Sequence, residues 1–105
     1  GDRVITQLAR HILSNSREGD LLCRMGGEEF LLLLPGASLT QATGLAERLR
    51  KQVEMQQFEG AGQVTISLGV TLFYPGKANI DGALKTADKA LYQAKNKGRN
   101  CVVNL

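Results

Sequence analysis

Two short apolar runs, separated by two glycines and two acids, constrain the fold more than any other part of the sequence. Leu21–Met25 and Phe30–Leu34 are each long enough for a strand, and Gly26-Gly27-Glu28-Glu29 lies between them. Because glycine readily adopts the positive φ angles that tight turns require, the pattern predicts a β-hairpin. Pro35-Gly36 then ends the second strand.

Helical spacing of apolar residues predicts three helices. The first runs from Arg3 to about Ser14. The second begins with a capping box made by Ser38 and Gln41. The third is capped by Asn79 and ends near Gly98, since glycine is common just after a helix.

Two further strands complete the predicted order of helix, hairpin, helix, strand, helix, strand. Apolar and polar residues alternate from Val64 to Leu72, the clearest strand pattern in the chain, and Cys101–Leu105 predicts a short last strand. The order indicates an α+β fold, an α/β sandwich in which helices flank a mostly antiparallel central sheet. The chain opens directly on a helix, so we expect its first central strand to be absent from residues 1–105.

Composition excludes several classes of protein. At 105 residues, with 43% hydrophobic and 22% charged residues, the chain is typical of one globular domain. Its apolar runs are too short to span a membrane. Cys23 and Cys101 stand alone, which favours a reducing compartment. The net charge of +3 does not call for DNA or RNA as a partner.

The hairpin turn carries the sharpest chemical signal. Gly26 and Gly27 allow a ligand to approach the backbone closely, and Glu28 and Glu29 follow at once. Backbone amides beside a carboxylate suit a phosphate together with Mg²⁺, since this ion prefers oxygen ligands. A glycine-rich hairpin with solvated acids at its tip explains the same residues, so the pattern alone leaves both interpretations open.

Several motifs together resemble the GGDEF family of diguanylate cyclase domains. The hairpin sequence Met25-Gly26-Gly27-Glu28-Glu29-Phe30 is similar to the family signature in its Glu variant. Residues 64–70, 87–95 and 98–100 resemble the next strand, the last helix and its exit turn, and Gly1-Asp2 resembles the tail of an earlier motif. The resemblance implies a nucleotidyl-cyclase or palm-like fold, with residues 1–105 forming one GGDEF domain that lacks its N-terminal strand and first loop.

The resemblance also implies an activity, the condensation of two GTP molecules into cyclic di-GMP with release of pyrophosphate. Glu28 matches the catalytic acid that binds Mg²⁺ or Mn²⁺, and Glu29 belongs to the same signature, as metal support or in an ion pair. Gly26 and Gly27 match the backbone along the phosphates. Lys95 and Arg99 match the cations on the terminal phosphates, although cations near a helix C-terminus are favoured anyway.

Two more positions concern guanine recognition and regulation. Asp2 matches an acid that accepts hydrogen bonds from N1 and N2 of guanine, and it also suits a helix N-terminus. Arg17 and Asp20 fit the family's RxxD inhibitory site for cyclic di-GMP, and Arg48 matches a secondary contact to the same ligand. A solvated turn is the simpler interpretation of RxxD alone.

The resemblance implies partners as well. Each domain binds one GTP and the attack is reciprocal, so we expect a homodimer during catalysis. We expect a cytoplasmic domain without membrane contact, although its parent protein can be anchored, and no turnover by this fragment alone. The competing hypothesis is a catalytically inactive module that binds GTP or cyclic di-GMP. Other residues are assigned to packing (Phe58, Tyr92, His11) or to a structural hydrogen bond (Asp88).

Overall fold

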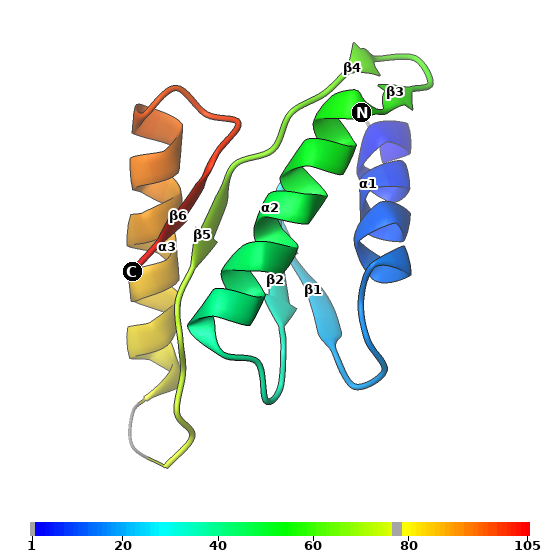
Figure 1. Cartoon of the computed structure of the whole chain (residues 1–105). Coiled ribbons are helices and arrows are strands. Elements are labelled where there is room, and N and C mark those ends of the chain that lie inside the picture. The colour runs from blue at the N-terminus through cyan, green and yellow to red at the C-terminus, as the bar shows by residue number, and fades with distance from the viewer. Residues whose placement is uncertain (1, 77–78) are drawn as a thin grey trace.

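The computed structural model describes residues 2–76 and 79–105, and it contains the predicted helices and strands in order, with one further hairpin after the second helix (Figure 1). The elements are α1 (Asp2–Ser14), β1 (Leu21–Gly26), β2 (Glu29–Leu33), α2 (Leu39–Met55), β3 (Gln57–Phe58), β4 (Gly62–Gln63), β5 (Leu68–Val70), α3 (Ile80–Asn96) and β6 (Val102–Asn104).

The predicted helix caps are confirmed. Ser38 Oγ accepts a hydrogen bond from the Gln41 amide at 3.1 Å, and the Ser38 amide donates to Gln41 Oε1 at 2.9 Å. Asn79 Oδ1 accepts from the Asp81 amide at 2.8 Å and so starts α3. Such caps satisfy backbone groups that the first turn leaves unpaired and are worth about 1 kcal/mol each.

No helix in the described part of the chain has the length and apolar character to cross a membrane.

The described strands form three two-stranded sheets, β1–β2, β3–β4 and β5–β6. The first two pairs are antiparallel, whereas β5 and β6 run parallel with Leu68 opposite Val102. The mixed helix and sheet architecture predicted from the sequence is confirmed. The predicted strand 64–72 is shorter than expected, because only residues 68–70 find a ladder partner among the described residues.

The short hairpin β3–β4 was not predicted. Phe58 is 2% exposed and anchors it in the core, while Gly60 takes a φ of +83° in its turn. The apolar signal covers too few residues to show strand alternation. The packing role expected for Phe58 is confirmed.

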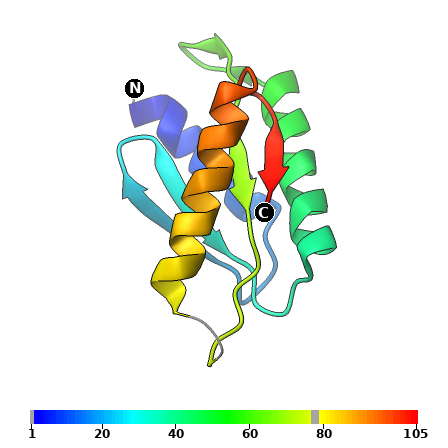
Figure 2. The same cartoon turned by 90° about the vertical axis from the view of Figure 1, so that its left-hand side faces the viewer.

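Two apolar clusters hold the helices against the sheets. The larger joins α1, α2 and the hairpin β1–β2, and its buried members are Leu8, Ile12, Leu49, Val53 and Phe58. The smaller joins α3 to β6 through Ala90, Ala94 and Val103. Seen from the side, the β5–β6 sheet lies between α3 and α2 (Figure 2).

Gly69 allows α3 to lie directly on the backbone of β5. A Cβ atom at Gly69 would come within 2.4 Å of the Ala87 carbonyl oxygen and of the Leu91 amide nitrogen. Real Cβ contacts are never that short, so any side chain here forces the helix away from the strand. The α3–β5 contact therefore depends on glycine at this position.

We predict that Gly69→Ala lowers the free energy of unfolding by about 1–3 kcal/mol, the usual cost of overpacking a tight contact. The matched control is Gly82→Ala, in the first turns of α3, where an added Cβ meets nothing within 4 Å. That variant should be neutral or more stable by up to about 1 kcal/mol. Urea denaturation measures both, and equal stability of the two variants would contradict the close-packing argument.

Candidate active site

The turn between β1 and β2 presents two acids on an exposed, glycine-built corner. Gly26 and Gly27 have φ angles of +141° and +52°, which L side chains rarely adopt, while the space around both is open. The requirement for glycine is therefore conformational. The register changes between Arg24 and Gly26, so Gly26 pairs with Glu29 and the turn is tight. Glu28 and Glu29 are both exposed.

Arg24 fixes this turn, a role that the sequence analysis missed. Its Nε and Nη2 atoms both donate to the carbonyl oxygen of Gly27, at 3.0 and 2.7 Å. A two-point contact from a planar guanidinium sets the orientation of the Gly27 peptide. The only signal in the sequence was an arginine two residues before the glycines.

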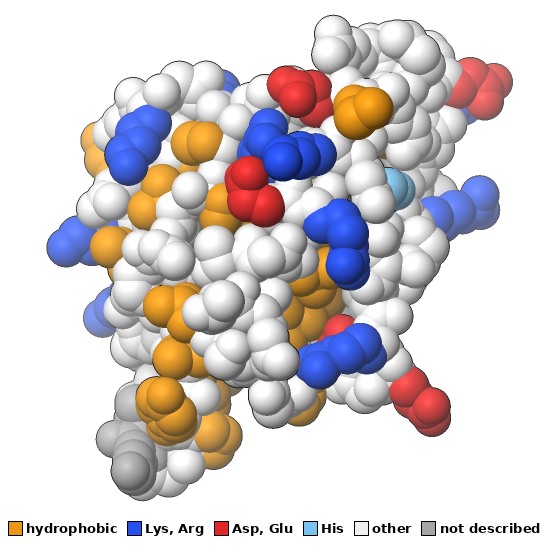
Figure 3. Space-filling model, viewed as in Figure 1, with side chains coloured by type: hydrophobic (Ala, Val, Ile, Leu, Met, Phe, Trp, Pro, Cys, Tyr) orange, Lys and Arg blue, Asp and Glu red, His pale blue; other side chains and the backbone are white. Residues whose placement is uncertain are grey.

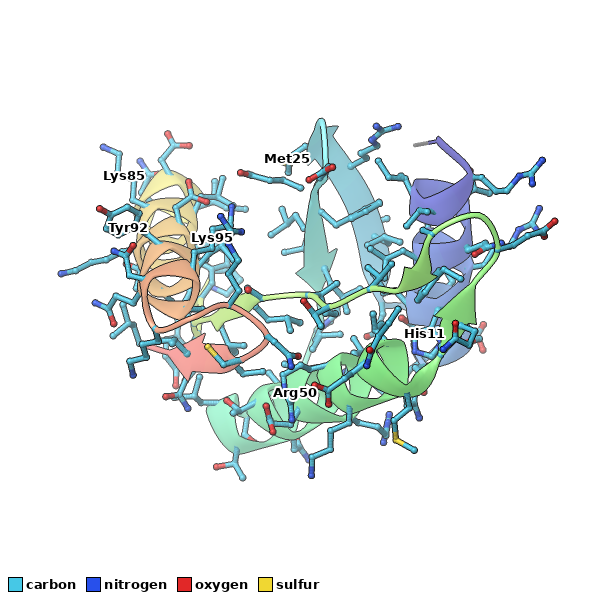
Figure 4. The ribbon with its side chains drawn as sticks, turned by 90° about the horizontal axis from the view of Figure 1, so that it is seen from above. His11, Met25, Arg50, Lys85, Tyr92 and Lys95 are labelled. Atoms are coloured by element: carbon cyan, nitrogen blue, oxygen red, sulfur yellow. The ribbon has the colours of Figure 1, made fainter. Side chains whose placement is uncertain are left out.

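A cavity of about 220 Å³ lies between the start of β2 and the helix α3. Glu29 lines it from the hairpin, and Lys95, Asp88 and Tyr92 line it from α3, together with Leu91. Figure 4 shows Lys95 on the side of α3 that faces the hairpin. Two predicted site residues that are 66 positions apart therefore share one cavity. Asp88, expected to make a structural hydrogen bond, lines this cavity instead, and Tyr92 is 66% exposed.

The acids and cations of this region have no partners inside the described part of the protein. Glu28, Glu29, Lys95 and Arg99 make no side-chain hydrogen bond or ion pair with another described residue. Arg99 is exposed in the turn after α3, with a φ of +64°. Of these four residues, Glu29 and Lys95 line the cavity. Unpaired charges of opposite sign in one cavity are the arrangement expected for a ligand that carries a cation and several anionic groups.

The carboxylate oxygens of Glu28 and Glu29 are ligands of the type that Mg²⁺ prefers. No group of three or more His, Cys, Asp or Glu side chains able to hold a metal is found among the described residues. Mg²⁺ is usually held by one or two carboxylates, with substrate phosphates and water filling its other positions. Glu28 and Glu29 could supply that carboxylate contribution.

The predicted inhibitory residues Arg17 and Asp20 bind each other. Asp20 Oδ2 accepts from the Arg17 amide at 2.8 Å, and Oδ1 accepts from Arg17 Nη2 at 3.3 Å. Arg17 Nη2 also donates to the Pro35 carbonyl oxygen at 3.1 Å, which ties the loop to the end of β2. Asp20 therefore organises its own loop, and its side chain is only 1% exposed.

One other predicted residue, Arg48, lies outside this loop and is not among the residues that line the cavity. Arg48 is exposed on α2 and contacts neither Arg17 nor Asp20 among the described interactions. On the face that carries α2, basic side chains are interspersed with acidic ones (Figure 3). The side chain of Asp2 lies outside the part of the chain that the structure describes, so its predicted contact with guanine stays a prediction.

Hydrogen bonding by Arg17 gives the loop a pH-dependent stability. The Arg17 amide, aided by the guanidinium, lowers the pKa of Asp20 below its ordinary value. A carboxyl whose pKa is lower in the folded state stabilises the fold above its unfolded pKa of about 3.9. This contribution is lost as the pH falls through the lowered pKa.

We predict that Asp20→Asn reduces the free energy of unfolding at pH 7. The difference from the unmodified protein should shrink as the pH falls below about 4, because both proteins then carry a neutral side chain at this position. Denaturant titrations between pH 7 and pH 3 measure this difference. Glu18→Gln, an exposed change in the same loop, is the control and should have little effect. A difference that stays constant over the whole range would show that the Asp20 charge contributes nothing.

Comparison with known proteins identifies the family. Residues 1–101 match the family model described as "Diguanylate cyclase, GGDEF domain". Diguanylate cyclase DgcM of Escherichia coli K12 is 47% identical over 103 residues, covering 98% of this chain and 25% of the relative. Response regulator PleD of Caulobacter vibrioides is 42% identical over 108 residues, covering 98% and 24%. The chain thus spans about a quarter of the length of these relatives.

Solved structures show the same fold. The active GGEEF domain of a diguanylate cyclase from Vibrio cholerae superposes with a TM-score of 0.90 at 31% identity, covering 98% of this chain and 67% of that one. Diguanylate cyclase SiaD of Pseudomonas aeruginosa, solved with its activator SiaC, gives a TM-score of 0.85 at 39% identity, covering 99% and 41%. The fold is thus nucleotidyl-cyclase-like, and the chain belongs to the GGDEF family.

Proposed function

We propose that this chain is the catalytic domain of a diguanylate cyclase, which condenses two GTP molecules into cyclic di-GMP and pyrophosphate. The observation that carries the proposal is the cavity in which Glu29 and Lys95 meet without pairing, next to the exposed Glu28. Family membership and relatives named as diguanylate cyclases support the same activity.

Each group of the site then has a task in phosphoryl transfer. Lys95 and Arg99 bind the terminal phosphates, and the Gly27 backbone, held by Arg24, lies along the phosphate chain. Glu28, with Glu29 beside it, holds Mg²⁺ or Mn²⁺, which when bound neutralises the triphosphate charge. Asp2 accepts from N1 and N2 of guanine.

The reaction needs two copies of the domain. The 3′-oxygen of one GTP attacks the α-phosphorus of the other, and its proton passes to the Glu28 carboxylate. A new oxygen–phosphorus bond forms, while the bond to the β-phosphate breaks and pyrophosphate leaves with its electron pair. Because the second attack mirrors the first, we infer a two-fold homodimer during catalysis. We also propose that the domain acts in the cytoplasm, where GTP is available to it.

We predict that Glu28→Gln lowers the rate of cyclic di-GMP formation by the complete protein at least about 100-fold, since general-base catalysis contributes on that scale. Chelation of Mg²⁺ should stop product formation, and excess Mg²⁺ should restore it. Glu59→Gln is the matched control, because Glu59 is an exposed acid whose only described partner is Arg3 on the surface. Chromatography of the nucleotides measures the rate.

Two results would count against the proposal. Full activity in Glu28→Gln would remove Glu28 from the chemistry. Binding of GTP and cyclic di-GMP by the unmodified protein without any product would favour the alternative function, that of an inactive binding module.

We further infer that cyclic di-GMP inhibits the enzyme by binding Arg17 and Arg48, while Asp20 holds the loop that carries Arg17. Arg17 is 57% exposed, so its guanidinium can turn toward a ligand while its backbone amide still holds Asp20. The support is the pattern of the RxxD motif and its position just before the hairpin. A related GGDEF domain, that of DgcB from Caulobacter crescentus, has been solved in complex with c-di-GMP.

We predict that Arg17→Ala raises the concentration of cyclic di-GMP needed for half-inhibition by about tenfold, as expected when a charge-assisted contact is lost. The uninhibited initial rate should stay within about twofold of normal. Initial rates measured with added cyclic di-GMP test this, and Arg10→Ala, an exposed arginine of α1, is the control. Unchanged inhibition in Arg17→Ala would rule out this contact.

A further inference from the structure

Asn100, directly after Arg99, has both ends of its side-chain amide held by residues of α2. Its Nδ2 atom donates to the Glu54 carboxylate, and its Oδ1 atom accepts from Arg50 Nη1 at 3.2 Å. Arg50 is itself fixed, because its Nε atom donates to Glu47 Oε1 at 2.9 Å and Nη1 lies 3.7 Å from Glu54 Oε1. The hydrogen bond from Arg50 lowers the pKa of Glu47, so this pair stays ionised at neutral pH.

The backbone at this point needs such support. Arg99 and Asn100 have φ angles of +64° and +48°, and they are the only described non-glycine residues with positive φ. That conformation is costly for an L residue such as arginine and persists where the surroundings enforce it. The backbone amide of Asn100 donates to Ser67 Oγ at 3.1 Å, and the backbone amide of Arg99 donates to the Ala94 carbonyl oxygen at 3.1 Å.

Within the described part of the chain, the contacts therefore fix one residue of the turn, Asn100, and leave the side chain of its neighbour Arg99 free. Asn100 is fixed through its side chain and its backbone, whereas the Arg99 side chain is exposed and has no partner among the described residues. The Arg50 side chain is only 14% exposed and already bound, so it is poorly placed to bind a ligand itself. Any effect of Arg50 on a phosphate ligand has to act through the turn.

We propose that Arg50, Glu54 and Asn100 form a positioning clamp that holds the Arg99 backbone so that its guanidinium is presented to the terminal phosphates of GTP. The inference rests on the proposed function and deepens it, because it names the residues that preorganise one of its phosphate contacts. A fixed backbone reduces the ordering cost when the ligand binds. A small displacement of a phosphate-binding group weakens the contact strongly.

The test is a double-mutant cycle on binding of a non-hydrolysable GTP analogue with Mg²⁺, measured by calorimetry on the complete protein. Arg50→Gln and Asn100→Gly should each weaken binding about tenfold, the scale of one misplaced charge-assisted contact. Asn100→Gly removes the side-chain contacts and keeps the positive φ accessible, so it is the second variant if Arg50→Gln fails to fold. Thermal unfolding checks that each variant is folded.

The decisive comparison uses Arg99→Ala as the background. If the clamp acts through Arg99, adding Arg50→Gln or Asn100→Gly to Arg99→Ala should cause no further loss of affinity. Equal losses with and without Arg99 would show a general structural role and overturn the clamp. Lys51→Gln, an exposed change on the same helix, is the control and should bind normally.

The remaining outcomes separate the clamp from the proposed function. Normal affinity in both clamp variants, with weakened binding in Arg99→Ala, would overturn the clamp and leave the GTP site standing. Normal affinity in Arg99→Ala, or no binding by the unmodified protein, would overturn the phosphate contact itself and the clamp with it.

Discussion

The hairpin β1–β2 and the sheet β5–β6 are held in one molecule by side-chain packing on α2, because no backbone ladder joins them among the described residues. Leu49 and Val53 of α2 pack with α1 and against side chains of the hairpin. The same helix also contacts β5 and β6. Burial of a Leu or Val side chain contributes about 1.5–3 kcal/mol. Hydrophobic packing on α2 therefore sets the relative position of the two sheets.

The geometry of the candidate site depends on the relative position of the two sheets. Its acids are on the hairpin, and its cations are at the end of α3 and in the turn that follows. The position of α3 depends in turn on Gly69, since the helix rests on bare β5 backbone at that point. The cavity between Glu29 and Lys95 therefore exists because of apolar packing and because Gly69 has no side chain. Glu29 and Lys95 do not form an ion pair that would hold each other in place.

Arginines serve as structural cross-links in three places of the described structure. Arg24 holds the hairpin turn, Arg17 ties the preceding loop to the end of β2, and Arg50 holds Asn100. In each place the planar guanidinium satisfies at least two acceptor contacts at once, which a lysine ammonium does with less geometric control. These contacts leave Glu28, Lys95 and Arg99 unpaired, so the groups assigned to the ligand do not have to break internal bonds first.

Much of the fold could be predicted because its signals are local. The capping box at Ser38, the Asn79 cap and the glycine turn at Gly26 each depend on residues within one turn of chain. The extent of β5 could not, because a strand ends where its partner ends, and β6 is more than 30 residues away. The β3–β4 hairpin was missed for a related reason, since Phe58 is fixed by long-range packing.

The features of the candidate site also separate into those that local motifs predict and those that need the tertiary structure. The sequence by itself determined the hairpin, its acids, the cations after α3 and membership of the GGDEF family, because those depend on short motifs in order. Only the tertiary structure decided that Glu29 and Lys95 share a cavity, that Asp20 is committed to its own loop, and that Arg24 and Arg50 act as supports. For the cavity and the Arg50–Asn100 bond the physical reason is distance along the chain, because each joins segments 50 or more residues apart. The contacts of Arg24 and Asp20 are local, but the residue types alone do not show which backbone carbonyl or amide each side chain reaches.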